Sequence, residues 1–301
     1  MTTLGLRDLG FVGGLGGGYT ITDADALAWA NNVASSDGVE LPDAIKQALD
    51  TYVQALKPTG LGGAAGSIWS QAAQLLLPCG PLTLAGALRP LKGAAPTNGS
   101  GSADATQFTS GNYSRKNGLG DASNASKYLI SNVATSVIAT TSHAYFAYGS
   151  IPAYPAGSAT TRVLVGTYDN VTAASLSLLQ ELEPQGAGVP TRLFRDASFI
   201  GSNISAGTAA NFMLGSRTAS NSTTLYVDSD SLTDTTSYPS VTSSTRFLAY
   251  YGFNNNGTFI ASSQSILQAT GIFSTGLNAT QAAALRTATA TYVAAVAAAI
   301  P

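Results

Sequence analysis

The feature that most constrains this fold is a regular alternation of strand-length and turn segments over residues 103–301. Turn signals recur about every 10 residues among Ser- and Thr-rich stretches, a spacing typical of antiparallel sandwiches and barrels. Phe146 and Tyr148 alternate with Tyr145, so we expect them to face the opposite side of a strand. The segments that favour strands are residues 105–108, 112–115, 128–131, 136–139, 143–149, 162–168, 175–181, 191–195, 209–217, 223–227, 245–251 and 271–275.

Helical patterns flank the strands on both sides. Thr22 is a suitable N-cap for a first helix, and residues 41–56 repeat apolar side chains at helical spacing. The Ala-rich residues 278–299 predict a terminal helix, which Asn278 or Thr280 would cap. We therefore expect a mainly β protein with an N-terminal helical segment and a C-terminal helix.

These patterns divide the chain into three parts. Residues 1–20 form a Gly-rich N-terminal arm, and glycine loses the most backbone entropy on ordering, so a partner surface would be needed to order it. Residues 21–60 predict a helical hairpin that anchors the protein. Residues 61–301 hold the predicted sandwich together with the C-terminal helix.

The composition excludes several kinds of site. Charged residues make up 10% of the chain, against about 25% in an ordinary soluble domain. The net charge of −2 argues against a nucleic-acid partner. Cys79 and His143 are the single residues of their types, which excludes an internal disulfide and any site built from several Cys or His ligands. We expect no secretory signal and no membrane span, since a span needs roughly 18 consecutive apolar residues.

The order of several short motifs resembles the concanavalin A-like (laminin G-like) proteins of bacteriophage virions. The matching segments, in chain order, are residues 45–57 (IKQALDTYVQALK), 67–71 (SIWSQ), 98–99, 103–104, 112–115 (NYSR), 215–217 (GSR), 225–228 (LYVD), 272–278 and 281–295. The chain departs from the pattern at residues 75–78 (LLLP), which replace an aromatic segment, and at residues 227–229, which replace an Asn-Gly turn. The resemblance implies an antiparallel jelly-roll β-sandwich.

Three aspartates close together are the candidates for a metal site. Asp228, Asp230 and Asp234 alternate with serines, and such carboxylates can bind Ca²⁺, which laminin G-like domains often carry. The alternative is a polar hairpin loop over residues 227–239, because no Gly or Glu completes a known calcium loop. No cofactor is predicted, and Ca²⁺ is the ion that these residues would take.

A tyrosine-rich segment is the candidate for a ligand or interface site. Tyr250, Tyr251 and Phe253 lead into Asn254, and aromatic faces beside amides suit either a sugar-binding rim or a protein interface. The alternative is a core strand that ends in an Asn-Gly turn.

The sequence offers weak support for catalysis. Glu181 and Glu183 have the alternate spacing of paired glycosidase carboxylates, but Pro184 follows at once and marks a strand end. A satisfied strand residue is the simpler interpretation of His143, and a small apolar residue that of Cys79. We therefore expect that the chain is not an enzyme.

These observations favour a virion structural protein. We expect a capsid decoration or cement protein, or a head fibre, that contacts other virion proteins through residues 1–60 and forms a homo-oligomer. The alternative is a tail-fibre or baseplate adhesin that binds host-surface carbohydrate.

Overall fold

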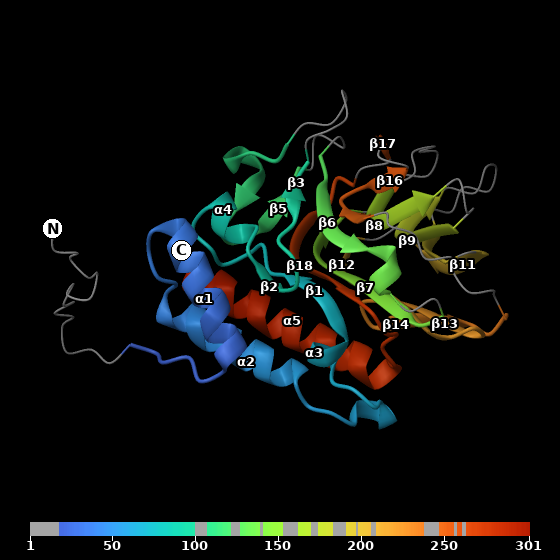
Figure 1. The fold of residues 1–301 in the computed structure, drawn as a ribbon, viewed down its shortest axis with the longest axis horizontal. Coiled ribbons are helices and arrows are strands. Elements are labelled where there is room, and N and C mark those ends of the chain that lie inside the picture. Colours follow the sequence, from blue (N-terminus) through green and yellow to red (C-terminus); the bar gives the residue numbers. More distant parts are fainter. Residues whose placement is uncertain are drawn as a thin grey trace, which may run out of the picture.

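The protein is represented by a computed structural model. It describes residues 18–99, 107–121, 127–138, 141–152, 162–169, 174–182, 191–196, 198–205, 209–237, 247–255, 258–260 and 263–301. Three layers lie side by side in Figure 1: helices, a first β-sheet, and a second β-sheet on the far side of the first. The predicted arm at residues 1–20 lies almost wholly outside the described residues.

The helical layer consists of α1 (Ala24–Asp37), α2 (Asp43–Leu56) and α5 (Ala279–Ala299). Asp23 caps α1, because its side chain accepts hydrogen bonds from two backbone N–H groups of the first turn. The predicted cap, Thr22, lies one residue too early. Gly38 ends α1 with a φ of 71°, a left-handed conformation that glycine adopts without strain.

The C-terminal helix begins where the sequence predicted. Asn278 and Gln281 form a capping box, in which each side chain bonds the other residue's backbone N–H. One face of α5 is buried against α2 and the first sheet, through side chains such as Leu285, Tyr292 and Val296. Within the described ranges, α5 is also long and apolar enough to cross a membrane by length and composition, a test that core helices also pass.

The first sheet is antiparallel and lies between the helices and the second sheet. Its strands follow the order β14-β13-β12-β7-β18-β1-β2, with β5 beside β18 and β4 beside β5. Their bounds are β14 Asp230–Asp234, β13 Ser222–Val227, β12 Ala210–Ala219, β7 His143–Ile151, β18 Ile266–Phe273, β1 Ala72–Leu76, β2 Pro90–Lys92, β5 Gly118–Gly120 and β4 Tyr113–Ser114.

The second sheet lies on the side of the first sheet that is away from the helices. Its strands follow the order β11-β10-β9-β8-β15-β6-β3, and β16 joins β8 in parallel while pairing with β17. Their bounds are β11 Ser198–Ser205, β10 Thr191–Asp196, β9 Ala174–Leu182, β8 Arg162–Asp169, β15 Phe247–Tyr250, β6 Leu129–Ala134, β3 Thr97–Asn98, β16 Phe253–Asn255 and β17 Thr258–Ile260. The protein is thus a mainly antiparallel β-sandwich with helices on one face.

Short helices join the larger elements. They are η1 Leu61–Gly63, α3 Ile68–Gln71, α4 Leu84–Ala87, η2 Ser110–Asn112 and η3 Thr135–Val137. The strand predicted at residues 136–139 is wrong over its described part, residues 136–138, because η3 covers residues 136 and 137 and no strand includes residue 138. The Ile138 N–H bonds to the Thr135 carbonyl at 3.1 Å, which closes a turn, and Val137 is 56% exposed.

Two hydrophobic cores lie on opposite faces of the first sheet. Phe146 and Tyr148 of β7 pack in the core beneath the helices, whereas Tyr145 packs in the core between the sheets. The alternation predicted for this strand is therefore confirmed. A strand buried on both faces must carry large apolar side chains in both directions, which explains its continuous aromatic and aliphatic sequence.

Candidate functional site

The predicted aromatic site is largely inside the molecule. Tyr250 and Tyr251 are 0% and 1% exposed and belong to the core between the two sheets. The Tyr250 hydroxyl donates to Gln74 Oε1 at 2.6 Å, and the Tyr251 hydroxyl donates to the Leu119 carbonyl at 2.5 Å. Their rings and hydroxyls hold the sandwich together, so they are not positioned to stack on a sugar at its rim.

The other two members of that predicted site lie on β16, a short strand of the second sheet between β8 and β17. Phe253 and Asn254 belong to β16, where Asn254 is in register with Thr167 of β8 and Phe259 of β17. Their side chains, and Gly257 of the predicted Asn-Gly turn, are outside the described part of the structure. Of the four residues, the structure therefore describes the side chains of Tyr250 and Tyr251, and both are in the core between the sheets.

The three aspartates proposed for a metal lie along the β13–β14 hairpin. Asp228 is in the turn with a φ of 48°, and its Oδ1 accepts from the Asn211 and Phe212 N–H groups at 3.1 and 2.9 Å. Asp234 Oδ1 accepts from the Thr236 N–H at 2.8 Å.

These hydrogen bonds fix the backbone of neighbouring residues. No group of three or more His, Cys, Asp or Glu side chains converges on a metal position among the described residues. Arg286 of α5 donates to the Asp228 carbonyl, which joins the terminal helix to the hairpin. The polar-hairpin alternative thus accounts for Asp228 and Asp234 as the structure places them.

Cys79 and His143 are both fully buried. Burial raises the pKa of the Cys79 thiol to about 12, so the reactive thiolate is absent at neutral pH. His143 begins β7 in register with Arg217, and its ring packs 5.4 Å from that of Tyr145. Cys79 therefore behaves as the small apolar residue predicted from the sequence.

Glu181 of the predicted carboxylate pair lies in β9. It is in register with Arg192 of β10 on one side and with Arg162 of β8 on the other. Glu183 falls outside the described residues. The structure thus describes one member of the pair, and an arginine is in register with it on each neighbouring strand.

A site that the sequence did not indicate fixes the chain where it leaves the N-terminal arm. Residues 18–23, here called the arm base, are held on α2 by the buried Asp50 carboxylate. Asp50 Oδ2 accepts from the Tyr19 hydroxyl, the Thr22 N–H and the Thr22 hydroxyl at 2.8, 3.0 and 2.9 Å. Asp50 Oδ1 accepts from the Asp23 N–H at 2.8 Å.

The electrostatics of the arm base favour the ionised carboxylate. Burial by itself raises the pKa of Asp50, but the hydrogen bonds from Thr22, Asp23 and Tyr19 outweigh it and lower the pKa to about 2. Lys57 Nζ adds ion pairs of 2.6 Å to Asp23 and 2.7 Å to Asp25. Charged groups therefore fix the position of the arm base against the helices.

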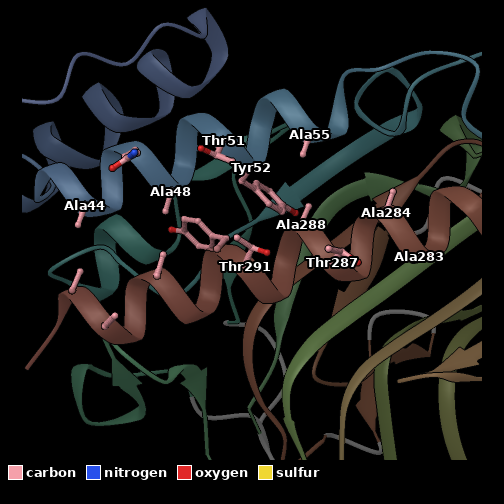
Figure 2. Close-up of a pocket in the computed structure, with 15 residues that line it drawn as sticks. Ala44, Ala48, Thr51, Tyr52, Ala55, Ala283, Ala284, Thr287, Ala288 and Thr291 are labelled. Carbon is pink, nitrogen blue, oxygen red and sulfur yellow. The ribbon is translucent and has the colours of Figure 1, made fainter.

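A groove runs along the outer surface of the helical layer, between α2 and α5 (Figure 2). We call it the small-residue groove, because Ala and Thr side chains form most of its walls. Its volume is about 850 Å³, and Tyr52 and Tyr292 lie in its floor with ring centroids 5.5 Å apart. The lining residues are Ala44, Gln47, Ala48, Thr51, Tyr52, Ala55, Ala283, Ala284, Thr287, Ala288, Thr291, Tyr292, Ala295, Ala298 and Ala299.

Comparison with known proteins gives structural likenesses alone. No family model matches the sequence, and no curated protein matches it significantly. Domain 4 of AbnA, a GH43 extracellular arabinanase from Geobacillus stearothermophilus, aligns with a TM-score of 0.39 and 13% identity over 54% of this chain and 73% of that one. Trypanosoma rangeli sialidase aligns with a TM-score of 0.45 and 12% identity over 81% of this chain.

The chain spans 37% of the length of that sialidase. The prediction that the chain is not an enzyme is corrected by this comparison, since glycoside hydrolases, an arabinanase and sialidases, are among the solved structures that align with it. That prediction is withdrawn. At these identities and TM-scores, the alignments assign no activity in its place.

Proposed function

We propose that the chain is a structural protein of a bacteriophage particle, a capsid decoration or cement protein or a head fibre. Residues 1–60 would contact other virion proteins, and the second sheet would face outward. As part of this proposal, we assign the sandwich to the concanavalin A-like jelly-roll group, on the motifs that run from residue 45 to residue 295.

The observation that carries the proposal is that the two sides of the molecule differ. The helices cover one face of the first sheet alone, so the layers run from the helices through the first sheet to the second (Figure 1). The arm base lies in the helical layer and is fixed there by Asp50 and Lys57. A protein with a rigidly oriented N-terminal attachment on one side and a sheet on the other suits display on a larger surface.

The test is to locate the chain in purified particles of the phage that encodes it. We expect mass spectrometry to detect the chain in stoichiometric amounts, and particle imaging to place the helical layer against the shell. A chain lacking residues 1–17 should fold but should be depleted from the particles. Absence of the full-length chain from purified particles would contradict the proposal.

The adhesin alternative loses its main support, because Tyr250 and Tyr251 are core residues. A glycan array on the purified chain checks it independently. Strong binding to host-surface sugars would favour a tail-fibre or baseplate position over a decoration role.

A further inference from the structure

The small-residue groove is an apolar surface without charge. Its walls carry no charged side chain, and Gln47 supplies the amide among them. Ala44, Thr51, Thr287 and Thr291 are exposed there. An apolar groove of this size marks a binding surface in many proteins. The question is which segment fills it.

The described chain begins at one end of this groove. Gly18 lies against α2, since a Cβ placed on it would be 3.3 Å from Asp43 Oδ2. Asp43 is the first residue of α2, and Ala44 is the first α2 residue that lines the groove. From Gly18 to Asp23 the arm base then follows α2 toward Asp50 and Lys57. Gly18 therefore lies beside the end of the groove that Ala44 marks.

The two helices run in opposite directions along the groove. Figure 2 places Thr51 opposite Thr291, and Ala55 opposite Ala288. Where α2 is followed by η1, the Asn278 amide at the start of α5 donates to the Leu61 carbonyl at 2.9 Å. From Ala44 to Ala55 the groove extends along α2 for about 16 Å at 1.5 Å per residue.

The sequence of the arm suits this groove in composition and in length. Residues 4–12 (LGLRDLGFV) carry four large apolar side chains besides Val12, and residues 13–18 (GGLGGG) contain five glycines that can reverse the chain over Asp43. Six extended residues already span about 20 Å, which exceeds the groove along α2. The tether also keeps the arm near the groove at a high effective concentration.

We infer that the small-residue groove is the docking site of the chain's own N-terminal arm, with residues 4–12 lying between α2 and α5. Leu and Phe side chains fill the space that Ala and Thr leave between the helices. Docking removes from water the apolar surface of the arm and of the groove together. The inference concerns the free chain and does not depend on where the protein sits in a particle.

Disulfide trapping in the full chain tests this inference. Gly10→Cys places a thiol between Leu9 and Phe11 without removing an apolar side chain, and Thr291→Cys places its partner on the groove wall. The matched control pairs Gly10→Cys with Ala290→Cys, at the residue of α5 just before Thr291, which is turned about 100° around the helix, away from the lining. The native Cys79 is buried and adds no background.

Each disulfide-formation rate is divided by the rate at which the same helix cysteine reacts with a small disulfide reagent, which corrects for exposure. We expect the Thr291→Cys pair to close within one chain roughly tenfold faster than the Ala290→Cys pair, because docking raises its effective concentration. Adding Leu9→Asp and Phe11→Asp should make the corrected rates of the two cysteine pairs equal.

Three results would overturn the inference. Equal corrected rates would show that the arm does not prefer the groove. A preference that survives the two Asp substitutions would show that apolar docking is not its cause. Disulfide-linked dimers whose yield falls on dilution would assign the groove to the arm of a second copy.

Discussion

The arm base and the interior of the sandwich are held by different kinds of interaction. At the arm base, the charged Asp50 and Lys57 bind the chain at residues 19–25. Inside the sandwich, the neutral Gln74 accepts from the Tyr250 hydroxyl at 2.6 Å and donates to the Ser131 carbonyl at 2.8 Å, which joins the two sheets. Charged contacts depend on pH whereas amide and hydroxyl contacts do not, so acid should loosen the arm base first.

The largest effect should come from removing a ring from the sandwich core. Tyr250→Ala leaves a cavity and an unpaired Gln74 oxygen, and should lower the free energy of unfolding by about 3–5 kcal/mol. Urea unfolding measures this. The control is Phe247→Ala on the same strand, where the residue is 42% exposed and the cost should be about 1 kcal/mol or less. Similar losses for the two variants would refute the core assignment of Tyr250.

A smaller effect should follow from removing the carboxylate of the arm base. Asp50→Ala leaves the Thr22 and Asp23 N–H groups without their acceptor, and should cost about 1–3 kcal/mol of unfolding free energy. It should also expose residues 18–23 to proteases under native conditions. Glu40→Ala is the control, because this exposed carboxylate contributes a 2.6 Å ion pair to Lys46, worth about 1 kcal/mol at most. Unchanged protease resistance in Asp50→Ala would contradict the proposed role.

The smallest effect should be the response of the arm base to acid. Because the pKa of Asp50 is lowered from 3.8 to about 2, its stabilisation is complete above pH 3.8 and is lost as the pH falls toward 2. The difference in unfolding free energy between the wild type and Asp50→Asn should therefore shrink over that interval, by on the order of 1 kcal/mol. A difference that is constant with pH would show that Asp50 does not carry the charge effect.

The sequence predicted the elements better than the sites. Period-two alternation identified β7, and a capping Asn before an Ala-rich run identified α5, because both signals are local. For Tyr250 and Tyr251 the sequence leaves both a ligand or interface site and a core strand open, because an aromatic run before Asn-rich residues has the same sequence whether it is buried or exposed. The tertiary structure decided that they are core residues, because β15, which ends at Tyr250, lies between β8 and β6, and both rings pack between the two sheets.

No local sequence pattern indicates the arm base or the small-residue groove. Asp50 resembles any polar residue of an amphipathic helix until Tyr19 and Thr22 fold onto it. The Ala residues of α2 and α5 form a groove because the two helices lie against each other, although they are more than 200 residues apart.

The sequence by itself determined the helices at both ends and the antiparallel strands between them, because periodicity and capping act over a few residues. Tertiary structure decided the rest. It set which face of each strand meets the helices, and it holds Tyr251 at a φ of 64°, where its N–H bonds to the Leu164 carbonyl at 2.8 Å. A bulky residue adopts that backbone conformation when surrounding contacts outweigh its strain, and residues distant in the sequence supply those contacts.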